Sequence, residues 1–198
     1  MKNIVFDIGN VLLDFKPEKF LENLGFNQEK RERILEVVFK SEEWIELDRG
    51  GIDNDTALKS FIQIAPDLKD EIKLVLNSWP EMLTPIHENV QLLTDLKSKG
   101  YNIYYLSNFH KDAFEKVYSK YDFLRVGHGG IISYQINMLK PHKFMYVALL
   151  SKYNLDPSET LFIDDSFDNI TGAKRVGLQC KLFTTSEDLK EFVNNQFQ

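Results

Sequence analysis

Three short apolar runs along the chain each end abruptly in polar residues. Residues 4–6 are followed by Asp7, residues 102–106 by Ser107 and Asn108, and residues 161–163 by Asp164 and Asp165. Short apolar runs closed by turn-forming residues predict buried strands, and the helical patterns between them predict a parallel sheet. Because ligand crevices of open parallel sheets lie at the carboxyl ends of the strands, we expect these polar side chains to converge there.

The stretch from residue 14 to residue 84 interrupts this alternation. It contains helical patterns near residues 17–24, 28–39, 55–64 and 68–76 and no convincing strand. Pro17 lies at its start and Pro80 and Pro85 at its end, and prolines disfavour helices that continue through them. The sequence therefore predicts an α/β fold with one core, residues 1–13 and 85–198, and an all-helical insertion over residues 14–84. A final amphipathic turn or two, in which Leu189, Phe192 and Val193 share a face, is expected to cover the sheet and to fray over residues 194–198.

Composition and charge narrow the class of protein. Of the 198 residues, 43% are hydrophobic and 27% are charged, which is ordinary for a folded globular chain. No stretch is long and apolar enough for a membrane span, and the apolar start is too short for a signal peptide, so we expect a cytoplasmic protein without a membrane partner. The net charge of −6 offers no overall attraction to nucleic acid. The single cysteine, Cys180, excludes an internal disulfide, and nothing identifies a protein partner.

Asp7 is the candidate nucleophile. A carboxylate can attack phosphorus to form an aspartyl phosphate, which divides ester hydrolysis into two displacement steps. Since carboxylate and phosphate are both anionic, a divalent cation must lie between them, and oxygen ligands from Asp7, Asp165 and a backbone carbonyl suit Mg²⁺. Successive strand residues point to opposite faces, so we favour Asp165 as a ligand and leave Asp164 as a ligand or as its support.

Ser107, Asn108 and Lys140 complete the candidate site. Ser107 and Asn108 offer a hydroxyl, an amide and backbone N–H groups for phosphate oxygens. Lys140 can neutralise charge as the phosphoryl group is transferred, although a lysine before Pro141 at a helix start is by itself typical of a solvated surface. The three polar strand endings elsewhere in the chain favour the catalytic role for this lysine.

These residues occur in order as four short motifs: residues 6–12, residues 106–108, Lys140-Pro141, and residues 162–165 followed by Asp168 and Asn169. In this arrangement the chain resembles the haloacid dehalogenase superfamily over nearly its whole length. The resemblance implies a Rossmann-like core that binds Mg²⁺ and a helical cap that closes over a small substrate. It also implies individual roles: Asp7 as nucleophile and metal ligand, the Gly9 carbonyl and Asp165 as metal ligands, Ser107 and Asn108 as phosphate binders, and Lys140 as the charge-neutralising group. Asp168 and Asn169 would either support the metal loop or cap the following helix.

Gly9 departs from the pattern of that superfamily. Its phosphatases carry a second aspartate two residues after the nucleophile, which protonates the leaving group and then activates water. The variant sequence at residues 7–11 resembles a subgroup that includes bacterial α-D-glucose-1-phosphate phosphatases, and a sugar C1 phosphate has a comparatively good leaving group. We therefore expect Mg²⁺-dependent hydrolysis of a small phosphomonoester, a sugar phosphate. Turnover should depend on the leaving group unless another side chain supplies the proton; Asp14 is one alternative, although its position favours a turn or hinge.

Two other functions stay open. One is metal-independent dehalogenation of 2-haloacids, where halide leaves without a proton, although Asp164 and Asp165 would then be a costly pair of like charges. The other is a catalytically silent member that binds a phosphorylated ligand or a protein.

In the insertion, Trp44, Asp48 and Arg49 either face the crevice and recognise a sugar or an anion, or Trp44 packs between helices and Arg49 pairs at the surface. The four histidines lack metal-site spacing and are expected at the surface or in the core.

Overall fold

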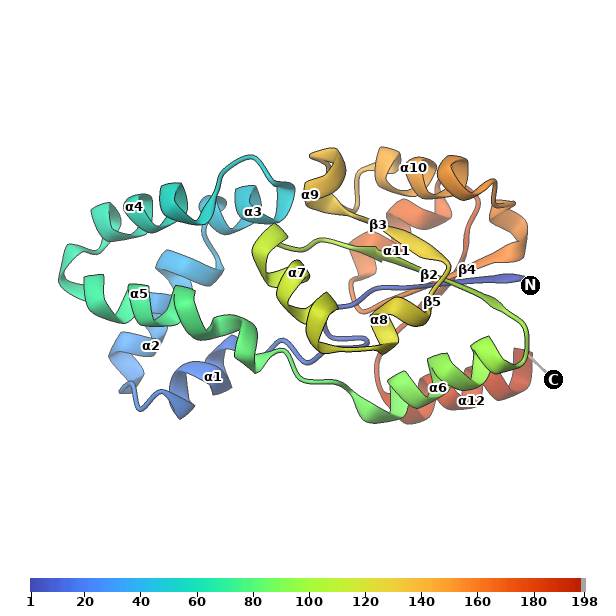
Figure 1. The fold of residues 1–198 in the computed structure, drawn as a ribbon, viewed down its shortest axis with the longest axis horizontal. Helices are drawn as coiled ribbons and strands as arrows, with labels where there is room; N and C mark the ends of the chain where they lie inside the picture. The colour runs from blue at the N-terminus through green and yellow to red at the C-terminus, as the bar shows by residue number, and fades with distance from the viewer. Residues whose placement is uncertain (197–198) are drawn as a thin grey trace.

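The computed structural model describes residues 1–196 and shows a five-stranded parallel sheet beside a helical lobe (Figure 1). The strands are β1 (Asn3–Phe6), β2 (Asn102–Ser107), β3 (Gly129–Ile132), β4 (Thr160–Asp164) and β5 (Gln179–Leu182). Their order across the sheet is β3-β2-β1-β4-β5, so β1 is central, and every pairing is parallel. The α/β class predicted from the sequence is confirmed.

Both faces of the sheet are covered by helices. Ile4 and Phe6 pack into the larger apolar core and Val5 into the smaller one, because successive strand side chains point in opposite directions. In Figure 1, α10 (Lys143–Tyr153) and α11 (Phe167–Lys174) lie over one face, and α6 (His87–Ser98) and α12 (Ser186–Gln196) lie over the other. The shorter helices α7 (Lys111–Lys120), α8 (Phe123–Val126) and α9 (Ser133–Ile136) lie between β2 and α10 in the chain.

The lobe on the left of Figure 1 is the helical segment between β1 and α6. Its helices are α1 (Pro17–Asn23), α2 (Gln28–Ile34), α3 (Glu42–Arg49), α4 (Asn54–Ile64) and α5 (Lys69–Ser78), with 3₁₀ turns at Pro66–Leu68 and Trp79–Met82. Asn27, Ser41 and Asp53 begin α2, α3 and α4 as N-caps, each accepting a hydrogen bond from a backbone N–H three residues later. Residues 28–39 are helical as expected, although their last part, Leu35–Phe39, is a π-helical turn and not α-helix.

Two segments of chain connect the lobe to the sheet side by side. Asp14 N donates to Thr84 O at 2.8 Å, Ile86 N donates to Leu12 O at 2.9 Å, and residues 13 and 85 form an antiparallel bridge. Within the described chain, no strand of the sheet lies between β1 and β2. These observations agree with an inserted helical cap, and its limits at residues 14 and 84 stay a prediction.

The sequence did not predict β3, β5 or the full length of α12. β3 begins with two glycines, and β5 is a half-exposed edge strand with the sequence QCKL, so neither carries a continuous apolar run. Residues 194–196 continue α12, residues 197–198 lie outside the described part of the chain, and the fraying expected over residues 194–198 stays a prediction. None of the helices within residues 1–196, α12 included, is long and apolar enough to cross a membrane.

Candidate active site

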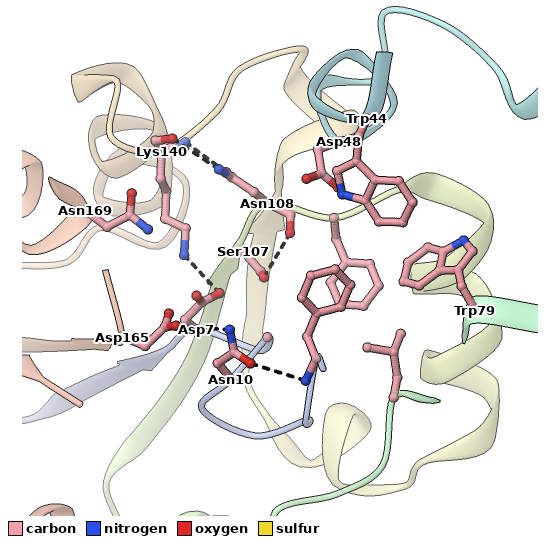
Figure 2. Close-up of a pocket in the computed structure, with 14 residues that line it drawn as sticks. Asp7, Asn10, Trp44, Asp48, Trp79, Ser107, Asn108, Lys140, Asp165 and Asn169 are labelled. Atoms are coloured by element: carbon pink, nitrogen blue, oxygen red, sulfur yellow. Dashed lines mark hydrogen bonds and ion pairs between the residues drawn. The ribbon is translucent and has the colours of Figure 1, made fainter. Parts of the chain in front are cut away.

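A cavity of about 170 Å³ lies where the carboxyl ends of the strands meet the helical lobe. Its polar side contains six residues that follow strands or lie in the loops beside them (Figure 2): Asp7, Asn10, Ser107, Asn108, Lys140 and Asp165. Gly9 and Asn169 also line it, whereas Asp164 is fully buried and lies outside the lining. The structure thus brings the predicted residues together from sequence positions far apart.

Lys140 holds two carboxylates together beneath the cavity. Its Nζ lies 2.9 Å from Asp7 Oδ1 and 2.6 Å from Asp164 Oδ2, and all three side chains are almost entirely shielded from water. Burial raises the pKa of Asp7 to about 7, against the opposing charge of Lys140. Burial by itself would lower the pKa of Lys140, but the charges of Asp7 and Asp164 raise it above its usual value. The lysine is therefore a buried cation, as a charge-neutralising role requires.

Three carboxylates form a cluster that fits a divalent cation. Asp7, Asp164 and Asp165 each offer one oxygen, and these oxygens all lie within 4.8 Å of one another. Hard oxygen ligands at this spacing suit Mg²⁺, and one lysine does not balance three negative charges. Partial burial and then the charge of Asp164 raise the pKa of Asp165, which is a further sign of crowded negative charge.

The two adjacent aspartates of this cluster differ in their hydrogen bonds. Asp164 Oδ1 accepts from Ser166 N at 2.8 Å and from Asn169 Nδ2 at 3.0 Å, while its other oxygen accepts from the lysine. Asp165 Oδ2 accepts one bond, from Asn10 Nδ2 at 3.1 Å. The carboxylate of Asp165 is therefore the more available of the two to a metal. Asn169 supports the carboxylate loop, whereas Asp168 is exposed in the first turn of α11.

Asn108 uses its side chain to fix the loop that carries Lys140. Its Oδ1 accepts from Lys140 N at 2.8 Å, and its Nδ2 donates to Lys140 O at 3.1 Å. Both groups of the amide are thus engaged with the backbone of the lysine. The Ser107 hydroxyl interacts with the Asp7 carboxylate and works against the raised pKa of that group. Its other contact, from Oγ to Asn108 O, is long at 3.5 Å. The hydroxyl therefore lies beside the nucleophile and is available to a ligand.

The opposite side of the cavity is aromatic. It is lined by Phe15, Trp44, Trp79, Leu83 and Phe109. The rings of Trp44 and Trp79 have centroids 4.9 Å apart, and Phe15 lies 6.1 Å from the first and 6.2 Å from the second. Trp44 therefore packs between cap elements and also faces the crevice, and its recognition of a sugar or an anion stays a prediction. Arg49 instead pairs with Glu46, with Nε 3.0 Å from Oε1, and lies outside the lining of this cavity.

Asp48, one of the three cap residues that the sequence placed near the crevice, has a partner that the sequence did not reveal. It lies in the last turn of α3, lines the cavity, and has Oδ1 3.3 Å from Nε2 of His110. Burial, and then the negative charge of Asp7, raise the pKa of Asp48 to about 8. His110 is a core residue with 2% exposure, and burial lowers its pKa to about 3, so it is neutral at physiological pH. No local pattern signals this pair, because its members are 62 positions apart in the chain.

The fold and the cluster at the strand ends define a hydrolase of the haloacid dehalogenase type. The family model of haloacid dehalogenase-like hydrolases matches residues 1–177, and the chain belongs to this family. Among curated proteins, the sesquiterpene phosphatase AstK of Aspergillus oryzae is 25% identical over 181 residues, which cover 89% of this chain and 87% of that protein.

Solved structures show the same fold at lower identity. A family enzyme of Bacteroides thetaiotaomicron, crystallised with magnesium and inorganic phosphate, has a TM-score of 0.75 at 22% identity and covers 97% of this chain and 98% of its own. An L-2-haloacid dehalogenase of Xanthobacter autotrophicus, with chloropropionic acid covalently bound, has a TM-score of 0.70 at 16% identity. The match covers 100% of this chain and 84% of the dehalogenase chain. Since one fold serves both reactions, the choice between them depends on the site.

Proposed function

We propose that this protein is a Mg²⁺-dependent phosphatase that hydrolyses a small phosphomonoester through an aspartyl phosphate on Asp7. The observation that carries the proposal is the buried cluster in which Lys140 Nζ lies 2.9 Å from Asp7 Oδ1, beside two further carboxylates within 4.8 Å. A phosphatase among the relatives supports the same class of reaction. No nucleic acid or membrane partner is part of this proposal, and a cytoplasmic location stays a prediction.

In the first step, a carboxylate oxygen of Asp7 attacks phosphorus while the bond from phosphorus to the leaving oxygen breaks. Lys140 stabilises the charge that moves onto the phosphoryl oxygens, and Ser107 Oγ together with the backbone N–H of Asn108 binds them. In the second step, water attacks the phosphorus of the aspartyl phosphate, releases inorganic phosphate and restores the Asp7 carboxylate. The side-chain amide of Asn108 acts indirectly, because its bonds at 2.8 and 3.1 Å hold the lysine loop.

Asp7, Asp165 and the Gly9 carbonyl are the groups that would hold Mg²⁺. Asp164 would serve as a further ligand or, through its bond of 2.6 Å to Lys140, as the support of the site. When bound, the ion supplies positive charge between two anions, the nucleophile and the phosphate. The crowded carboxylates also disfavour metal-independent dehalogenation, because such a cluster destabilises a site that has no cation to bind.

The substrate we favour is a sugar phosphate. The cavity of about 170 Å³ is smaller than the ~300–1,000 Å³ of most ligand sites, so it suits a compact leaving group. The aromatic side of the cavity offers rings that match the C–H face of a sugar ring. The aromatic side and the sesquiterpene phosphatase relative favour one other candidate, the monophosphate of a more apolar alcohol.

A phosphate-release screen tests this proposal. The substrates are glucose 1-phosphate, glucose 6-phosphate, p-nitrophenyl phosphate and an allylic terpenoid monophosphate, each assayed with Mg²⁺ and with EDTA. We expect release only with Mg²⁺, and Asp7→Asn should lower kcat by about 10⁴-fold or more, as expected when a covalent nucleophile is removed. Asp168→Asn, an exposed carboxylate on α11, is the matched control and should retain activity.

Three results would reject the proposed function. They are full activity in EDTA, full activity of Asp7→Asn, or chloride release from 2-chloropropionate without metal in place of phosphate release. A chain that binds phosphate but releases none from any ester would instead be the catalytically silent member of the family.

A further inference from the structure

The phosphatase reaction needs a proton for the leaving oxygen, and Gly9 cannot supply it. An acid from the helical lobe lies at the same cavity. Asp48, on α3, lines it together with Asp7 and Ser107, and Figure 2 shows Asp48 across the cavity from Asp7. Asp14, the alternative suggested by the sequence, pairs with Lys16 at 2.5 Å and lies outside the lining of the cavity.

The core holds the end of α3 in place, so the position of Asp48 relative to Asp7 is defined. Ser133 Oγ donates to the carbonyl of Asp48. Asn137 Nδ2 donates to the next two carbonyls, at 3.3 Å to Arg49 O and 3.1 Å to Gly50 O. Gly50 ends the helix with φ at +76°, a conformation that glycine adopts without strain, and a Cβ there would make a tight contact of 3.0 Å with Tyr134.

Burial, more than any neighbouring group, raises the pKa of Asp48 and favours its protonated form. The negative charge of Asp7 opposes ionisation, while the charge of Lys140 and the backbone N–H of His110 partly favour it. The imidazole of His110, 3.3 Å away, is neutral and packs against Trp44 and Trp79 with ring centroids 4.2 and 5.0 Å apart. A carboxyl that keeps its proton near neutral pH at the mouth of the site is suited to general acid chemistry.

We propose that Asp48 is the general acid, and then the general base, of the phosphatase reaction, a role that rests on the function proposed above. As Asp7 attacks phosphorus, the Asp48 carboxyl donates its proton to the leaving oxygen, which departs as the neutral alcohol. The Asp48 carboxylate then takes a proton from the water whose oxygen attacks the aspartyl phosphate. Phosphate and the Asp7 carboxylate are released, and Asp48 is again protonated for the next turnover.

This role changes the expected dependence on the leaving group. A steep preference for activated esters is expected only where no side chain supplies the proton, so wild type should depend weakly on the leaving group. Asp48→Asn keeps the size of the side chain and removes the proton. It should lower the phosphorylation rate with propyl phosphate by about 10²- to 10⁴-fold and that with p-nitrophenyl phosphate by less than about tenfold.

Stopped-flow kinetics separate the two steps. With p-nitrophenyl phosphate, Asp48→Asn should give a burst of p-nitrophenol equal to the enzyme concentration, followed by slow turnover, because the second step lacks its base. With propyl phosphate no burst of product should occur. The kcat/KM of wild type for propyl phosphate should decrease above about pH 8, where the acid ionises, and this decrease should be absent in Asp48→Asn.

Two variants complete the test. Asp14→Asn should behave as wild type with both esters. Gly9→Asp places a carboxyl at the usual position of the family acid, and it is sterically allowed because a Cβ at Gly9 meets no atom within 4 Å. In the double variant with Asp48→Asn, it should restore part of the propyl phosphate rate, which a merely structural role for Asp48 does not explain.

Several outcomes would overturn the assignment of Asp48. They are wild-type rates in Asp48→Asn, equal losses of the phosphorylation rate for both esters, or loss of propyl phosphate hydrolysis in Asp14→Asn. In each case, an inactive Asp7→Asn would show that the phosphatase function itself stands. Full turnover by Asp7→Asn would instead reject the phosphatase mechanism and this role with it.

Discussion

At the scale of single residues, the buried carboxyl groups around the cavity lower the free energy of unfolding at neutral pH, because burial disfavours their charged forms. Burial raises the pKa of Asp48 from 3.8 to about 8, so the folded state retains a proton that the unfolded chain releases near pH 4. At any pH between these two pKa values, folding therefore takes up a proton at Asp48. The contribution of Asp48 to stability is fully present below pH 4 and is lost as the pH rises through 8.

Asp48→Asn removes this proton uptake. Compared with wild type in EDTA, the variant should gain stability as the pH rises from 4 to 8, by up to about 1.4 kcal/mol per pH unit. The measurement is the free energy of unfolding by urea at several pH values for both proteins. For Asp168→Asn, at an exposed site, the difference from wild type in the free energy of unfolding should not change with pH. A pH-independent difference for Asp48→Asn would mean that this carboxyl is already ionised in the fold.

At the scale of elements, the loop between α9 and α10 depends on a close approach to α11. Residue 172 is a buried glycine in α11, and a Cβ there would lie 2.6 Å from Pro141 O. The same loop is held from β2 by Asn108, through the two hydrogen bonds to Lys140. The position of the lysine is therefore determined by packing between two elements on either side of it.

Gly172→Ala should push this loop away from α11. Because its added methyl group meets backbone, we expect a loss of about 1–3 kcal/mol in the free energy of unfolding. A shift of the lysine by a fraction of an ångström should also lower kcat by up to about 10²-fold, with a smaller change in KM. Urea unfolding and steady-state kinetics measure both effects. Lys174→Ala, at an exposed position on the same helix, should change the free energy of unfolding by less than about 0.5 kcal/mol. Equal losses in Gly172→Ala and Lys174→Ala would contradict the role of packing at Gly172.

At the scale of the whole molecule, the site depends on both the sheet and the helical lobe. The core provides the nucleophile and the carboxylate cluster at the strand ends and the lysine in the loop between α9 and α10, and the lobe provides Trp44, Asp48 and Trp79. A ligand that binds the folded state alone stabilises the entire chain by mass action. Binding of Mg²⁺ to the carboxylate cluster should therefore be measurable as global stability, independently of any activity.

Mg²⁺ should raise the melting temperature of wild type in a concentration-dependent way. At about 100 times the dissociation constant, the gain is about 2.7 kcal/mol. Asp165→Asn should lose most of this gain because it removes the most available carboxylate, and Asp168→Asn should keep it. Thermal unfolding at increasing Mg²⁺, with equal ionic strength from NaCl, is the measurement. An unchanged Mg²⁺ response in Asp165→Asn would remove this carboxylate from the metal site.

The parts of the fold that the sequence predicted are those with a strong local signal. The strands that end at Phe6, Ser107 and Asp164 are buried on both faces, so each has an apolar run that is visible without any knowledge of its neighbours. The helical segment between the first two strands is equally visible, because prolines and helical periodicity are local properties. β3 and β5 escaped prediction because edge strands are only partly covered and need no such run.

The same division applies to the site. The order of the motifs around Asp7, Ser107, Lys140 and Asp165 is enough to single out these residues, since the carboxyl ends of parallel strands meet at one edge. The sequence offered Asp48 only as one of three cap residues that could face the crevice and recognise a sugar or an anion. Its proximity to His110 and Asp7, and the proton that it retains, arise only when the helical lobe closes on the sheet. Burial and the field of distant charges set that pKa, and these are properties of the folded molecule.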